Sequence, residues 1–244
     1  MNLCLKRRMT AVQHQPIPDA LQEKINLFRT ATVLRRFQIN TQSDALYVNL
    51  NYLAELSEYF HVLRTGSYSE NLSERVNFDD VFTEELVTFL SYVCPEGFEF
   101  DRTINRYNIS PLVYFSDRLM FPWVKQEIKK YLKSDDFKNE PYDTESLIDL
   151  AYLLHSQAYA LVTINHCSME QKEYIYSTVD IDPIFKKIAR LSDVSVVDKA
   201  VAAVPDNSIR VFITERIIHF RPYTYQPRPQ SFFDWNDTRS RLFF

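Results

Sequence analysis

Hydrophobic and polar positions follow two rhythms along the chain, one typical of strands and one typical of helices. In residues 45–50 (ALYVNL) apolar and polar side chains alternate, which places the apolar ones on one face, and residues 33–40 (VLRRFQIN) are rich in strand-favouring types. The polar link between them, residues 41–44, is short enough for a hairpin. The pattern therefore predicts two antiparallel strands.

A helix is predicted to follow this hairpin. Its apolar positions recur at spacings of three, four and three residues, which places them on one face: Leu53, Leu56, Phe60 and Leu63. We expect this stripe to form part of the core or of a dimer face. Gly66 follows it, and glycine commonly ends a helix in the left-handed conformation.

A short strand and another helix are predicted next. Residues 76–81 form the strand, and Thr83 is expected to cap a helix whose first turn carries two acids, which the helix dipole favours. The buried face of that helix is expected to contain Leu86, Phe89, Leu90 and Val93. Pro95 ends it.

Longer helical patterns dominate the second half of the chain. Two helices are predicted within residues 104–132, with Pro122 breaking the run between them. Asp143 or Thr144 is expected to cap a long helix, and residues 171–204 hold two more helical pieces. The apolar stripe of the long helix is Leu147, Leu150, Ala151, Leu154, Ala158 and Leu161.

These elements predict four regions. Residues 1–18 read as a flexible arm, and residues 19–134 as one domain. The charged segment 133–142, which contains a proline and has no apolar period, marks the boundary to a helical region at 143–204. Residues 205–244 begin with a strand-like stretch (SIRVFITERIIHF) and end in a tail rich in proline and aromatic residues.

Composition excludes two classes of partner. The chain has 244 residues with 45% hydrophobic and 25% charged residues, as in ordinary globular proteins. No apolar run approaches the roughly 18 to 20 residues that cross a bilayer. The net charge of -4 comes from interspersed acids and bases, so no nucleic-acid-binding face is predicted. We expect neither a membrane nor a nucleic acid as partner.

Glycine and cysteine are scarce, and their scarcity removes common catalytic and cofactor motifs. Only two glycines are present, whereas dinucleotide-binding turns, phosphate-binding loops and hydrolase nucleophile turns each need closely spaced glycines. The three cysteines form no Cys-x-x-Cys pair, which favours free thiols in the cytoplasm or the nucleus. Zinc-ligand spacing is absent. We therefore expect no metal, no cofactor and no enzymatic activity.

The stretch YVNLNYLAELSEYFHVLRTGSYSENLSERVNFDDVFTEELVTFLSYVCPE, with Leu53, Ala54 and Phe60 in its first helix, resembles the central part of a BTB (POZ) domain. Residues 115–117 (Phe-Ser-Asp) stand where that family has an LAD-like motif. The resemblance covers about residues 33–134. It implies an α+β fold, a small sheet flanked by a cluster of helices, and residues 143–204 are similar to the start of the BACK-type helices that often follow.

Within this resemblance, Tyr68, Ser69 and Glu70 match a hydrophobic residue, any residue and an acid, the pattern by which members of the family bind cullin-3. The likeness implies a dimeric, non-catalytic adaptor that links a cullin-3 ubiquitin ligase to an unknown client. An aromatic anchor beside a carboxylate suits docking, because the ring fills a pocket and the charge fixes the register. The candidate cullin contacts are Tyr68, Glu70, Asp80 and Tyr92.

A competing hypothesis is a BTB assembly scaffold without a role in ubiquitination. The resemblance implies homodimerisation in both cases. Asn49 and Leu50 replace a His-Lys pair that is frequent in the transcription-factor branch of the family, so corepressor recruitment is not implied. A client is expected to bind the C-terminal region, residues 208–244, or the amino-terminal arm.

Overall fold

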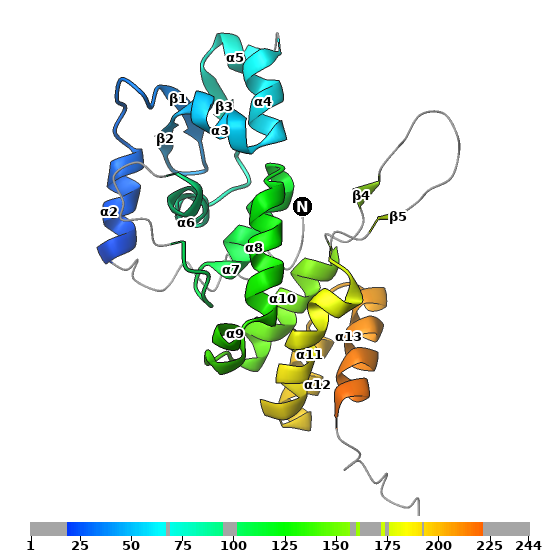
Figure 1. The fold of residues 1–244 in the computed structure, drawn as a ribbon. Coiled ribbons are helices and arrows are strands. Elements are labelled where there is room, and N and C mark those ends of the chain that lie inside the picture. The colour runs from blue at the N-terminus through cyan, green and yellow to red at the C-terminus, as the bar shows by residue number, and fades with distance from the viewer. Residues whose placement is uncertain are drawn as a thin grey trace, which may run out of the picture.

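The computed structural model describes residues 19–66, 69–94, 102–156, 160–161, 172–173, 176–191 and 193–221 (Figure 1). Its helices are α2 (Asp19–Phe28), α3 (Leu50–Leu56), α4 (Glu58–Thr65), α5 (Ser69–Leu72), α6 (Thr83–Val93), α7 (Ile109–Arg118), α8 (Pro122–Lys133), α9 (Asp135–Asn139), α10 (Thr144–Ser156), α11 (Thr178–Leu191), α12 (Val194–Ala202) and α13 (Asn207–Phe220). Its strands are β1 (Phe37–Asn40), β2 (Ala45–Val48), β3 (Arg75–Asn77), β4 (Ala160–Leu161) and β5 (Lys172–Glu173). None of the helices in these ranges is long and apolar enough to cross a membrane. The described fold is thus mixed α and β, and mostly helical.

A small sheet forms the centre of the first half, with its strands in the order β2-β1-β3. The predicted hairpin is confirmed, because β1 pairs antiparallel with β2 and Ile39 lies opposite Leu46. β3 pairs parallel with β1, so Ile39 also lies opposite Val76. Parallel pairing requires a crossover, and α3, α4 and α5 supply it. β3 ends at Asn77, earlier than the strand predicted over residues 76–81.

The prediction of a single helix after the hairpin is wrong, because the helix is interrupted at Ser57. This residue is extended, with φ -137° and ψ 128°, and it both ends α3 and caps α4. The Phe60 amide donates to the Ser57 hydroxyl oxygen at 3.1 Å, and that hydroxyl donates to the Leu119 carbonyl at 2.5 Å. Leu53, Phe60 and Leu63 are buried nonetheless, and Leu56 is partly buried.

Two predicted helix ends also differ. Gly66 follows α4 with φ -80° and ψ 158°, so the left-handed cap expected there is wrong. Thr83 is the first residue of α6, and its cap is Phe82. The Thr83 hydroxyl instead lies 2.7 Å from the Thr41 hydroxyl. The buried stripe predicted for α6 is confirmed at each position: Leu86, Phe89, Leu90 and Val93.

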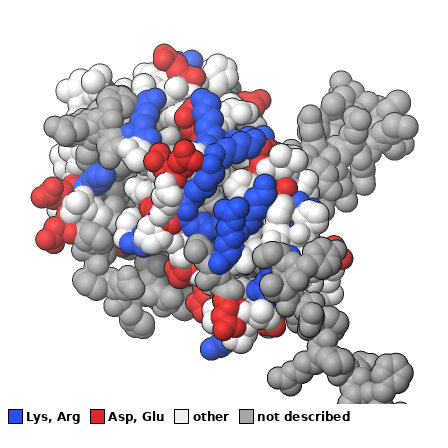
Figure 2. Space-filling view, turned by 60° about the horizontal axis from the view of Figure 1, so that its bottom comes forward, with Lys and Arg blue, Asp and Glu red and all other residues white. Residues whose placement is uncertain are grey.

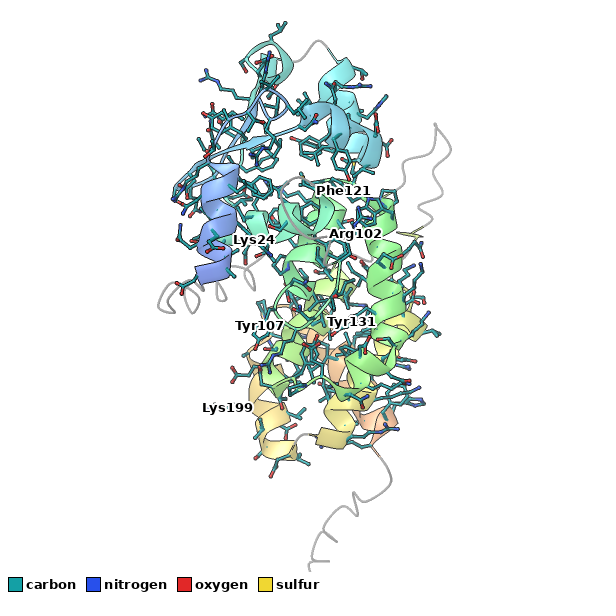
Figure 3. The ribbon with its side chains drawn as sticks, turned by 60° about the vertical axis from the view of Figure 1, so that its left-hand side comes forward. Lys24, Arg102, Tyr107, Phe121, Tyr131 and Lys199 are labelled. Carbon is teal, nitrogen blue, oxygen red and sulfur yellow. The ribbon has the colours of Figure 1, made fainter. Side chains whose placement is uncertain are left out.

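One hydrophobic cluster runs through both halves of the described chain. Phe121, labelled in Figure 3, lies where they meet, with its ring centroid 6.2 Å from that of Phe60 and 5.1 Å from that of Phe89. The segment predicted to separate two domains folds as α9, and its Phe137 is fully buried. The Lys187 ammonium of α11 donates to the carbonyls of Phe137, Lys138 (3.1 Å) and Glu140 (2.6 Å).

The strand-like stretch predicted after residue 205 is wrong, because these residues form α13. Asp206 caps this helix and accepts from the amides of Ser208 (2.8 Å) and Ile209 (3.1 Å). The buried residues of α13, Ile209, Ile213 and Ile217, lie four positions apart, a helical spacing that outweighs the strand preference of their types. The arm at 1–18 and the tail at 222–244 lie outside the described residues.

Candidate docking surface

A shallow groove with an apolar floor lies on the first half of the molecule. We call it the docking groove, and its cavity volume is about 350 Å³. α4 supplies most of its walls, while α5 and the turn between α7 and α8 supply one residue each. The lining residues are Glu58, Tyr59, Val62, Leu63, Glu70 and Met120.

A left-handed turn presents Met120 to the groove. Met120 has φ 54°, which is unusual for a residue other than glycine. The turn is held because the Ser57 hydroxyl donates to the Leu119 carbonyl and the Glu58 amide donates to the Met120 carbonyl at 3.3 Å. The Met120 side chain remains 43% exposed. The helix break at Ser57 and this turn therefore form one hydrogen-bonded unit.

Tyr59 forms the aromatic part of the floor. Its ring meets that of Phe60 edge-on, with centroids 5.2 Å apart and planes at 86°. Burial raises the pKa of the Tyr59 phenol, the Arg118 guanidinium opposes this, and the Glu70 carboxylate adds to it. The phenol is therefore neutral near pH 7, and Tyr59 contributes a rigid, uncharged surface.

Charge on the groove is negative, because Glu58 and Glu70 are its only ionisable acids or bases besides Tyr59. Glu58 is exposed, and Glu70 is partly buried. Val62, between them along the chain, is 45% exposed. The groove therefore fits an apolar side chain that is flanked by a lysine or an arginine.

Asp80, a predicted cullin contact, is held by Arg118 within the chain. The guanidinium donates to both carboxylate oxygens at 2.7 and 2.8 Å, and it also lies over the Phe78 ring at 5.1 Å. The hydrogen bonds from Arg118 hold the pKa of the Asp80 carboxyl below its usual range, although burial opposes this. The Asp80 carboxylate is thus paired within the chain, with Arg118.

Tyr92, another predicted contact, lies in the interior instead of on the surface. Only 5% of it is exposed, and its ring stacks on Trp123 with centroids 5.8 Å apart and planes at 12°. Burial raises the pKa of its phenol to about 12. Such a buried ring is not accessible to a docking protein. Tyr68, the proposed aromatic anchor, lies outside the described residues.

Of the predicted contacts, Glu70 alone lines the groove in the described part of the chain. The sequence reasoning missed Tyr59, Val62 and Met120. Tyr59 and Val62 carried a signal, because they are apolar residues off the buried stripe of their helix. Met120 carried none, since its exposure depends on a turn conformation that its residue type does not favour.

Other chemistry is sparse in the described ranges. No group of three or more His, Cys, Asp and Glu side chains there is placed to hold a metal ion. Cys94 is buried, and burial lowers the pKa of His155, whose ring stacks on Phe212 with centroids 4.0 Å apart. The docking groove, by contrast, combines exposed apolar side chains with two carboxylates, which is the chemistry of a binding surface.

Neither a protein-family model nor a curated protein matches the sequence of this chain.

Proposed function

We propose that this protein is a non-catalytic adaptor with a BTB-like first half, which docks a cullin-3 type scaffold at the groove. The resemblance of residues 33–134 supports the family, and so does the arrangement of a hairpin with a third strand parallel to β1 and helices packed around it. The proposed partners are a cullin-3 type scaffold, a second copy of the chain and an unidentified client.

The docking groove beside Glu70 is the observation that carries this proposal. The resemblance assigns Glu70 to cullin contact from the sequence, and an apolar groove with this carboxylate on its rim lies at that position. Exposed Val62 and Met120 supply apolar area that a partner would remove from water. A central, desolvated anchor of this type commonly carries much of the binding energy of an interface.

The same groove suits a protein better than a small substrate. Its volume of about 350 Å³ is at the low end for small-molecule sites. Its charged groups are two carboxylates, so the groove presents one sign of charge to a partner. A surface helix of a partner, with an apolar residue beside a basic one, matches the lining by shape and by charge.

Two pairs of substitutions test the proposal by titration calorimetry with the amino-terminal domain of cullin-3. Val62→Glu places a charge on the floor of the groove, and Val211→Glu places one on α13 at similar exposure, 45% against 48%. Glu70→Lys reverses the rim charge, with Glu215→Lys on α13 as its match. We expect Val62→Glu to weaken binding by about 2 kcal/mol or more, roughly 30-fold.

The control variants are expected to bind within about twofold of the unchanged protein, because surface substitutions away from a contact are nearly neutral. Tyr68→Ala is expected to resemble Val62→Glu. Equal affinity of Val62→Glu and Val211→Glu would remove the groove from the interface. Absence of binding by the unchanged chain would remove the cullin-adaptor function altogether.

The second candidate function is an assembly scaffold without a role in ubiquitination, and exposed apolar side chains favour it. Val33 and Leu34, between α2 and β1, are 78% and 67% exposed. Covering them would favour self-association. Light scattering of the chain alone and with the cullin domain separates the candidates: a scaffold gives a dimer or larger assembly that does not gain mass when the domain is added.

A further inference from the structure

Lys and Arg side chains gather in a band across the helical second half of the molecule, as Figure 2 shows. The helices of this half that carry exposed cations include α8, α9 and α11. We define the cationic face by four residues, Lys129 and Lys133 on α8 and Lys186 and Arg190 on α11. Each pair is spaced by four residues, so each forms a row along its helix.

One carboxylate of α11 forms ion pairs with two lysines of α8. Asp180, in the first turn of α11, lies 2.7 Å from the Lys133 ammonium and 3.6 Å from that of Lys129. Burial opposes ionisation of Asp180, but the hydrogen bonds from Lys133 and Ser177 outweigh this and lower the pKa of the carboxyl. One acid therefore serves two lysines, and positive charge is left in excess.

The second row has no such acid. Within the part of the chain that the structure describes, no carboxylate forms an ion pair with Lys186 or Arg190, and both residues are exposed. The nearby Asp182 is instead paired with Arg216 of α13. Lys186 and Arg216 lie on the Phe220 ring at 5.2 and 5.1 Å from its centroid. Both cations thus contact one partly buried aromatic ring.

The spacing within each row fits an extended peptide. Residues one helical turn apart are about 6 Å from each other, and alternate side chains of an extended strand project on one side about 6.6 Å apart. Acidic side chains at every second position of a peptide can therefore reach Lys186 and Arg190 together.

Nucleic acid fits this face less well. A duplex offers one negative charge per roughly 1.7 Å of its axis, which is much denser than the about 6 Å between the cations of one row. The chain as a whole carries a net charge of -4, which also opposes a polyanion. A peptide can carry its acids at the spacing of the cations.

We propose that the cationic face formed by Lys129, Lys133, Lys186 and Arg190 binds an extended acidic peptide segment of a client protein. This proposal does not depend on cullin docking, because the face lies on the helical half and shares no residue with the docking groove. It assigns client binding to described helices, whereas the sequence indicated the C-terminal region or the amino-terminal arm.

Fluorescence anisotropy tests the proposal with a dye-labelled peptide of alternating Glu and Ser, at about 0.15 M salt, where the Debye length is about 8 Å. Peptides with Gln in place of Glu and a dye-labelled DNA duplex serve as comparison probes. The unchanged chain is expected to bind the Glu peptide at least about tenfold more tightly than the Gln peptide or the duplex.

Lys186→Glu with Arg190→Glu is expected to weaken binding of the Glu peptide at least about tenfold, and Lys186→Gln with Arg190→Gln by a smaller factor. The matched control reverses the same amount of charge elsewhere: Lys24→Glu on α2 with Lys199→Glu on α12, both labelled in Figure 3. It is expected to bind within about twofold of the unchanged chain. Equal losses in both reversals, preference for the duplex, or no binding of the Glu peptide would each overturn the proposal.

Discussion

The two halves of this molecule present opposite surfaces. The sheet-bearing half, residues 19–94, supplies five of the six residues that line an apolar groove with carboxylates on its rim, and Met120 is the sixth. The helical half, residues 102–221, offers two rows of cations, one on α8 and one on α11. Surfaces of opposite sign select different partners, since a ligand suited to one is repelled by the other. An adaptor that must hold two proteins at once benefits from this separation.

The polar interiors of the halves differ in a related way. Among the buried polar residues described in the sheet-bearing half, hydroxyls predominate: Thr41 contacts Thr83, and Ser57 donates to the Leu119 carbonyl. Near the cationic face, the Lys187 ammonium and the Asp180 carboxylate make such contacts. Charged groups respond to pH and to loss of a partner more strongly than hydroxyls do. We therefore expect the helical half to respond more to charge-changing substitutions.

The largest effect is expected for Phe121→Ala, because this ring joins the halves. It is fully buried between Phe60 and Phe89, and its removal leaves a cavity that costs about 3 to 5 kcal/mol. Since one core runs through both halves, urea unfolding should remain a single transition that moves to lower concentration. Two separate transitions, with only one of them shifted, would show instead that the halves fold independently.

The next largest effect is expected for Lys187→Met. Its ammonium satisfies three carbonyls at the end of α9, and burial lowers the pKa of this ammonium. Methionine is of similar length but donates no hydrogen bond, so the buried carbonyls lose their donor at a cost of about 3 kcal/mol. The neighbouring Lys186→Met, on the exposed side of α11, should cost less than about 0.5 kcal/mol. Similar losses in the two variants, measured by urea unfolding, would contradict the capping role.

A smaller, pH-dependent effect is expected for Asp180→Asn. The pKa of the Asp180 carboxyl is lower in the folded chain than its ordinary value of 3.8, so its stabilisation is complete above that value and is lost as pH falls through the folded pKa. The asparagine should cost about 1.5 kcal/mol at pH 7. The cost should shrink as the pH falls through the folded pKa, because the carboxyl then becomes neutral like the asparagine. A cost that does not change as the pH is lowered would assign the effect to the shape of the side chain rather than to its charge.

Periodicity in the sequence was sufficient to predict most of the elements. The hairpin and the buried stripe of α6 follow from the spacing of apolar residues alone. Packing against other elements buries these residues but does not change their periodicity. The break at Ser57 does not, since it depends on a carbonyl 62 residues away in the chain. α13 could have been predicted from Ile209, Ile213 and Ile217, had their spacing been weighed above their strand preference.

The candidate site was less predictable than the fold. Glu70 was found because a short motif marks it, but its apolar neighbours come from helix α4 and from Met120, in a turn about 50 residues later in the chain. Proximity of this kind is a tertiary property that no local pattern encodes. The same limit applies to Tyr92, whose burial against Trp123 depends on packing between α6 and α8.

The smallest effect is expected for Asp80→Asn, and it separates internal pairing from docking. The Arg118 and Asp80 side chains are 29% and 36% exposed, so solvent screens their attraction and the change should cost at most about 1 kcal/mol. Because Arg118 already occupies both carboxylate oxygens, cullin affinity should stay within about twofold of the unchanged chain. A loss in affinity as large as that of Glu70→Lys, at unchanged stability, would return Asp80 to the interface. It would also extend the docking surface from the groove towards Phe78, whose ring lies under the same guanidinium.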